Sequence, residues 1–156
     1  MISLPLLPAA IVAEARSWLG TPFVHGAAIK GVGVDCVQLS RAVYMAVAVA
    51  PPDFPDFLPY PTGWLLERGD MRYRDAIATH MTPVWVDGAP TTPVAAPGDL
   101  ALFRIGRAAA HSAIVTTWPL VIHAWDEDCV VEVSGTTNVL RARPLVSLWR
   151  PTVLCG

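Results

Sequence analysis

The feature that most constrains the fold of this chain is a change of pattern near Thr82. Before that residue, apolar residues are spaced as in helices and are interrupted by loops rich in proline and glycine. After it, short runs rich in β-branched and aromatic residues follow one another, bounded by proline, glycine or aspartate clusters: PVWVD, DLALFRI, HSAIVTT, LVIHAW, CVVEVS and LVSLWRP. Helices followed by an antiparallel sheet predict an α+β fold.

Three helices are predicted, over residues 8–19, 36–48 and 63–81. Pro8 lies near the start of the first helix, and Gly20 ends it. The second has mostly apolar faces, which predicts a buried central helix, and it ends before Pro51. Loops are predicted between the helices, over residues 21–34 and the proline-rich residues 51–62.

The composition bounds the class of protein. With 156 residues, 53% of them hydrophobic, residues 1–156 are expected to form one domain around one core. A net charge of −2 gives no basic surface for nucleic acid or anionic lipid. No apolar run approaches the ~18 residues of a membrane span. The apolar N-terminal segment has no preceding Lys or Arg, so we expect mature structure there and not an export signal.

Three cysteines are too few and too irregularly placed for a disulfide framework, and they form no C-x-x-C pair or zinc-finger spacing. We therefore expect no metal ion and no cofactor. Cys129 and Cys155 are interpreted as a strand residue and a tail thiol. Cys36 differs, because it follows Asp35 at a helix start, where unpaired N–H groups and a partial positive charge favour a thiolate. This position predicts a nucleophile with a lowered pKa.

Two histidines lie far downstream in AHSAIVTTWPLVIHAW, which reads as two strands of a hairpin. A turn centred near Thr117 would place His111 directly opposite His123, with Cβ atoms roughly 4.5–5.5 Å apart. One imidazole could then orient the other, and the pair could supply the base for a Cys36 nucleophile.

Three segments carry a resemblance to a known family: GTPFVHGAAIKGVGVDCVQL, PGDLALFRIG and HSAIVTTWPLVIHAW, in that order. With them the chain resembles the NlpC-type, papain-like cell-wall cysteine peptidases, and most closely their small phage-tail versions. The resemblance implies N-terminal helices packed on a C-terminal antiparallel sheet, with Cys36 as nucleophile, His111 as base and His123 as third catalytic residue. Asp126 is the alternative for the third role.

The chain also departs from the family pattern near the nucleophile. Many members have a tyrosine at the position of Phe23, with a hydroxyl near the nucleophile, and Phe23 cannot supply one. Val37 and Gln38 stand where the common motif has Ser-Gly. These changes bear on substrate fit and on rate.

The resemblance implies a peptidoglycan hydrolase that cleaves an amide of the stem peptide, often the bond from γ-D-glutamate to diaminopimelate. By the same resemblance, the protein is made in the host cytoplasm, joins tail-tip proteins in a phage particle, and opens the cell wall during DNA entry. The alternative is a structural component of the tail tip with weak or no hydrolase activity. An acyltransferase of the permuted branch is disfavoured, because there the histidine precedes the cysteine.

Overall fold

The computed structural model describes residues 1–51, 60, 70–105, 108–125, 128–136, 140 and 142–156. Its centre is a six-stranded antiparallel sheet with the strand order β3-β8-β4-β5-β6-β7. The strands are β3 (Met81–Val86), β4 (Leu100–Ile105), β5 (Ala108–Val115), β6 (Leu120–Ala124), β7 (Val130–Ser134) and β8 (Leu145–Pro151). Each predicted β run forms one of these strands, and the α+β class is confirmed.

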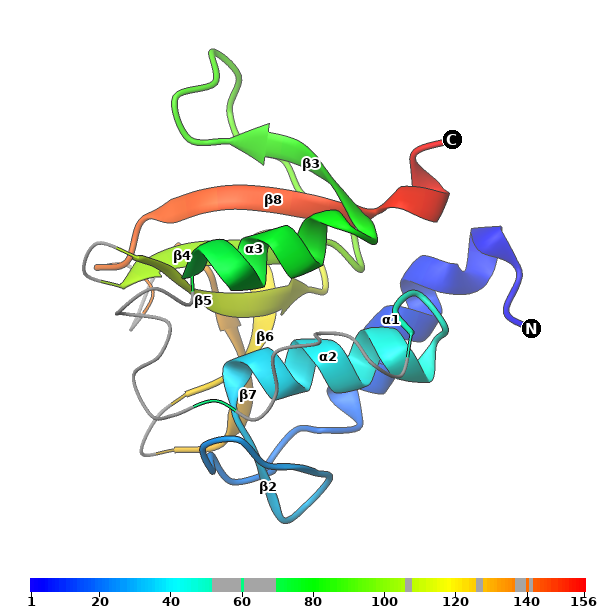
Figure 1. The fold of residues 1–156 in the computed structure, drawn as a ribbon, viewed down its shortest axis with the longest axis vertical. Coiled ribbons are helices and arrows are strands. Elements are labelled where there is room, and N and C mark those ends of the chain that lie inside the picture. Colours follow the sequence, from blue (N-terminus) through cyan, green and yellow to red (C-terminus); the bar gives the residue numbers. More distant parts are fainter. Residues whose placement is uncertain (52–59, 61–69, 106–107, 126–127, 137–139, 141) are drawn as a thin grey trace.

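Among the described residues, three α-helices precede the sheet in sequence and pack against one of its faces (Figure 1). They are α1 (Leu7–Arg16), α2 (Cys36–Ala46) and α3 (Asp70–Ala78), and the single turns η1 (Leu4–Leu6) and η4 (Thr152–Leu154) lie near the chain ends. The first two helices are shorter than predicted, and α3 ends at Ala78, before the predicted end at residue 81. In α2 the reason is local, since Ala48 has a φ of 60°, in the left-handed region that cannot continue a helix.

Parts of the earlier predictions fall outside the described residues. These are residues 52–59 of the proline-rich loop and 61–69, where the third helix was expected to begin. Within the described part of the chain, no helix is long and apolar enough to cross a membrane.

Buried side chains fill both faces of the sheet. On the helical face, Ile11 of α1, Val43 of α2 and Ile77 of α3 pack with Leu102 and Ile114 of the strands, and each is at most 1% exposed. On the other face a second cluster forms around Phe103, with Trp85, Trp118 and Trp125 packed against it. Side chains that alternate along each strand therefore point into two apolar clusters, one on each face of the sheet.

The turn before β4 fixes how that strand enters the sheet. Gly98 has a φ of +88°, which favours glycine, and an added Cβ would lie 3.1 Å from Cδ1 of Ile11. The next residue, Asp99, accepts two hydrogen bonds of 2.9 Å from the guanidinium of Arg150 on β8. These contacts join α1, β4 and β8 at one end of the sheet.

Candidate active site

Cys36 is the first residue of α2, as the sequence predicts, and its side chain is half-buried. The preceding Asp35 is the N-cap, and its Oδ1 accepts a hydrogen bond of 2.8 Å from the backbone N–H of Gln38. A cap of this kind typically contributes about 0.5–2 kcal/mol. Asp35 therefore fixes the helix start that carries the thiol.

The second carboxylate oxygen of Asp35 gathers two further donors. Oδ2 accepts from the backbone N–H of Gly26 at 2.7 Å and from the hydroxyl of Tyr60 at 2.6 Å. His25 stands beside this group, with Nδ1 3.9 Å from Oδ2 and its ring edge-on to Tyr60. A hydroxyl thus reaches this end of α2 from Tyr60 and not from position 23. This contact could not be predicted from the sequence, because Tyr60 lies 25 residues from Asp35 in a proline-rich stretch.

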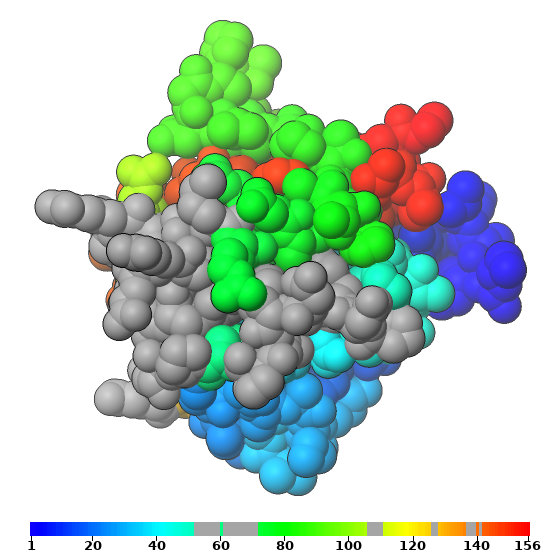
Figure 2. Space-filling view, viewed as in Figure 1, coloured from blue at the N-terminus to red at the C-terminus, as the bar shows by residue number. Residues whose placement is uncertain are grey.

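The segment before Cys36 contains a short hairpin that was predicted only as a loop. It pairs β1 (Ala28–Ile29) with β2 (Gly33–Val34), and two-residue strands are too short to show a sequence period. In Figure 2 this hairpin projects at the bottom of the molecule, in light blue.

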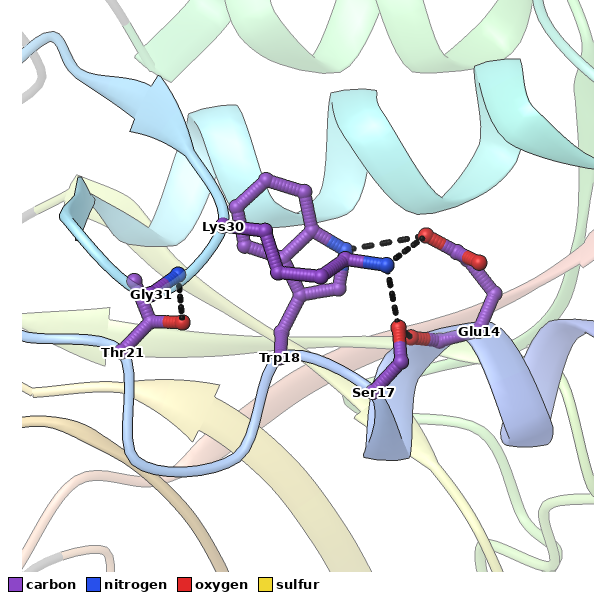
Figure 3. A network of polar contacts seen from close by, with 6 residues as sticks. All are labelled: Glu14, Ser17, Trp18, Thr21, Lys30 and Gly31. Carbon is purple, nitrogen blue, oxygen red and sulfur yellow. Dashed lines mark hydrogen bonds and ion pairs between the residues drawn. The ribbon is translucent and has the colours of Figure 1, made fainter.

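Polar contacts tie this hairpin to α1, as Figure 3 shows. The ammonium of Lys30 donates to the Glu14 carboxylate at 3.0 Å and to the Ser17 hydroxyl, and it lies 5.3 Å from the ring centroid of Trp18. The Trp18 indole N–H donates to the same Glu14 carboxylate at 3.1 Å. The hairpin that precedes Cys36 is therefore held against the C-terminal end of α1.

A buried hydroxyl cluster joins Cys36 to the sheet. The Ser112 hydroxyl of β5 donates to the Cys36 carbonyl at 3.1 Å, and Ser40 donates to the same oxygen at 3.2 Å. The Tyr73 hydroxyl of α3 donates to Ser112 at 3.0 Å. Cys36 is thus held against the strand residue that follows His111.

The two histidines meet, as the sequence predicts, but the predicted strand register is wrong. Nε2 of His111 lies 2.8 Å from Nδ1 of His123, and the ring centroids are 5.0 Å apart. The pairs Ile114↔Ile122 and Val115↔Val121 centre the turn on Trp118, one residue later than expected. His123 is therefore a diagonal neighbour of His111, and the reach of two imidazoles allows the contact.

This hydrogen bond decides which tautomer can act. If Nδ1 of His123 is the acceptor, the proton of neutral His111 lies on Nε2, and Nδ1 of His111 keeps a lone pair. His123 then carries its own proton on Nε2, a buried atom with no hydrogen-bond partner among the described residues. In the opposite arrangement His111 holds its proton on Nδ1 and cannot accept another there.

Burial sets the protonation of the site. Desolvation, with the charges of His123 and Arg143, lowers the pKa of His111 to about 3. Desolvation and Arg143 also lower the pKa of His123, to about 4, against an opposing effect of Asp128. Both imidazoles are neutral at pH 7.

The lowered pKa expected for Cys36 is wrong. Desolvation and the neighbouring Asp35 carboxylate raise the pKa of the Cys36 thiol to about 12, although the N–H groups of Ser112, Val37 and Cys36 act in the opposite direction. Very little of the thiol is then ionised at pH 7. The resting site therefore pairs a protonated thiol with neutral imidazoles, and the thiol loses its proton only with help from a base.

Trp125 is a neighbour of the histidines that sequence reasoning did not single out. Its ring lies edge-on to His111, with centroids 5.3 Å apart, and 5.5 Å from the ring of His123. The sequence held a signal for this contact, because Trp125 is two residues after His123 and shares its face of the strand.

Asp126, the alternative third catalytic residue, lies outside the described residues. Among the residues that are described, no three His, Cys, Asp or Glu side chains are placed to hold a metal ion.

Comparison with solved structures places this arrangement in a known fold. The NlpC/p60 domain of the peptidoglycan hydrolase SagA matches with a TM-score of 0.56 and 26% identity, over 90% of this chain and 97% of that one. The chain has the fold of an NlpC/p60 domain and is similar to this domain of a peptidoglycan hydrolase. An NlpC/P60 family protein of Bacillus cereus has a TM-score of 0.64 at 17% identity, and NlpC2 of Trichomonas vaginalis has 0.61 at 16%.

The chain covers 40% and 48% of the length of the latter two proteins, and 92% of its own residues match in each case. They share its fold. No protein-family model matches the sequence, and a search of curated protein sequences found no match. The NlpC-type assignment therefore rests on the fold and on the likeness to the SagA domain.

Proposed function

We propose that this NlpC-type protein is a peptidoglycan hydrolase that cleaves an amide bond of the stem peptide, of the γ-D-glutamyl-diaminopimelate kind. The observation that carries the proposal is the 2.8 Å contact between His111 and His123, beside a cysteine that begins a helix. The SagA domain, a peptidoglycan hydrolase, supports the substrate class. We also propose that residues 1–156 form one domain, since helices and sheet share a core.

In the proposed reaction, Nδ1 of His111 takes the proton of Cys36 while Sγ attacks the amide carbonyl carbon. The raised pKa of the thiol means that proton transfer accompanies formation of the S–C bond. His123 acts through His111, because its Nδ1 holds the proton of His111 on Nε2.

The tetrahedral intermediate carries its negative charge on the former carbonyl oxygen. The backbone N–H of Cys36 belongs to the first turn of α2, which has no earlier turn to bond to, and it can donate to this oxygen. Collapse breaks the C–N bond, and His111 returns its proton to the leaving amine. Water, deprotonated by His111, then hydrolyses the thioester and restores the thiol.

Digestion of purified peptidoglycan, with mass spectrometry of the soluble products, tests the reaction. Wild-type protein should release fragments with a new amine on diaminopimelate, and Cys36→Ala should release none. Cys129→Ala is the matched control, since Cys129 lies at a bridge with Pro22 and has no part in the mechanism. Equal release by wild type and Cys36→Ala would exclude Cys36 as the nucleophile.

We further propose that the protein acts as a component of a phage tail tip that carries it to the cell wall. Exposed apolar residues at the N-terminus support a docking role there: Met1, Ile2, Leu4 and Leu6. Mass spectrometry of purified particles should find the protein. Its absence from particles, with abundance in the periplasm instead, would favour a secreted hydrolase.

The second candidate function is a structural tail-tip component with weak or no hydrolase activity. The observation that favours it is the raised pKa of the Cys36 thiol together with the lowered pKa of His111. The thiol holds its proton tightly, and the imidazole that would accept this proton is a weak base. Particles that carry Cys36→Ala separate the two functions. Normal assembly with failed DNA entry supports the hydrolase, whereas normal entry supports the structural component.

A further inference from the structure

Trp125 packs against the histidine pair and is more exposed than either histidine. His111 is 3% exposed and His123 is completely buried, whereas Trp125 is half-buried. Its indole contacts both imidazoles, edge-on to His111 at an interplanar angle of 84° and tilted by 38° to His123.

A cation lies over the same indole. Cζ of Arg143 is 4.4 Å from the ring centroid of Trp125, a distance at which a guanidinium and an aromatic face attract each other. Arg143 is half-buried and precedes β8, and its backbone N–H donates to the carbonyl of Leu140 at 3.0 Å. The guanidinium therefore comes from a segment distant in sequence from both histidines.

We propose that Arg143 is a positioning residue, which holds the Trp125 indole against His111 and His123 and whose charge adds to the effect of burial in keeping the imidazole pair neutral. The inference rests on the proposed function, in which His111 must be neutral to accept the proton of Cys36. A planar guanidinium suits both tasks, because it stacks on an aromatic ring and stays charged at every working pH.

The charges around the pair agree with this role. The positive charge of Arg143 lowers the pKa of both histidines, whereas Asp128, before β7, raises that of His123. Arg143 is thus the cation that acts on both imidazoles from outside the pair.

Three substitutions of Arg143 separate its charge from its shape. Arg143→Met and Arg143→Gln remove the charge, and Met keeps an apolar stem on the indole. Arg143→Lys keeps the charge and loses the planar stack. Arg16→Gln is the control, because Arg16 is an exposed arginine that pairs with Glu132 at 3.1 Å.

The primary measurement is an NMR titration of the imidazole nitrogens from about pH 7.5 to about pH 2.5, which needs no substrate. We expect the pKa of both histidines to rise in Arg143→Met and Arg143→Gln and to stay at the wild-type value in Arg143→Lys and Arg16→Gln. In peptidoglycan digestion, the acid limb of the pH profile should move to higher pH in the two neutral variants. Arg143→Lys should keep the wild-type limb with kcat lowered about threefold, from the weaker hold on Trp125.

Histidine pKa values that are the same in wild type and in the folded neutral variants would overturn the inference. So would equal pKa changes in Arg143→Lys and Arg143→Met. If the wild-type protein digests no peptidoglycan, the proposed function fails, but the NMR titration still decides the role of Arg143. Two neutral variants are used so that misfolding of one, seen by circular dichroism, leaves the other as the test.

Discussion

His111 and His123 have different tasks in the proposed reaction, and their replacement should separate these tasks. His111→Ala removes the base and should lower kcat/KM by about 10²–10⁴-fold. His123→Asn keeps an acceptor for Nε2 of His111 and should retain activity within about tenfold of wild type. Peptidoglycan digestion at matched protein concentration measures both.

Circular dichroism checks that both variants fold. A complete loss in His123→Asn, equal to that in His111→Ala, would show that His123 does more than orient its partner. Full activity in His123→Ala with loss in Asp126→Ala would move the third role to Asp126.

The thiol of Cys36 should react slowly with simple alkylating agents. Desolvation and Asp35 raise its pKa to about 12, whereas Cys155 is exposed. At every pH below about 9, iodoacetamide should therefore modify Cys155 before Cys36, since the thiolate is the reactive form. Peptide mass spectrometry of time points gives both rates in one sample. Faster modification of Cys36 near neutral pH would mean that an imidazole already holds its proton in the resting protein.

Within α2, the cap residue Asp35 affects both stability and the thiol. Asp35→Ala removes the acceptor for the N–H of Gln38 and should lower the free energy of unfolding by about 0.5–2 kcal/mol or more, because Gly26 and Tyr60 also lose their acceptor. Asp35→Asn keeps a capping oxygen and should be less destabilised in urea titrations.

The same pair of variants tests the charge of Asp35. Its carboxylate is one cause of the raised pKa of Cys36, so Asp35→Asn should alkylate at Cys36 faster than wild type. An unchanged alkylation rate would assign the raised pKa to desolvation alone.

How far the elements could be predicted depends on their length. The six sheet strands were predictable because each alternates or runs apolar over five to eight residues between turn signals. The hairpin β1–β2 was not, because its strands hold two residues each. The predicted register of β5 and β6 was wrong because the turn is centred on Trp118 and not on Thr117. Sequence spacing alone does not say which of these two residues is central.

The candidate site was predictable where one local pattern carried it. Cys36 behind Asp35, and the histidines in neighbouring strands, needed only a helix start and a hairpin. The pKa of the thiol needed the tertiary structure, because desolvation depends on segments far away in sequence. Tyr60 and Arg143 lie in stretches without a period, and their contacts with Asp35 and Trp125 could not be predicted from sequence.

For the whole molecule, the buried histidines predict loss of stability in acid. Both have pKa values below 6.5 when folded, about 3 and about 4, so the unfolded chain binds more protons as pH falls below about 6.5. The free energy of unfolding should then fall with pH, by up to about 1.4 kcal/mol per pH unit for each histidine, until about pH 4.

Urea titrations from neutral to mildly acid pH measure this dependence. The double variant His111→Ala with His123→Asn is the control, because it has neither imidazole and keeps every carboxylate. Its unfolding free energy should depend less on pH than that of wild type. The same slope in both proteins would assign acid unfolding to other groups.

The protonated thiol of Cys36 also determines which inhibitors would suit this protein. Chloroacetamides and similar reagents need a thiolate before they react, and the resting site offers almost none. A nitrile or an aldehyde instead gains a proton on its nitrogen or oxygen as sulfur adds to carbon, and the thiol itself supplies that proton through His111. Compounds of this second kind, built on a short peptide, match the chemistry of a site that is neutral before its ligand arrives.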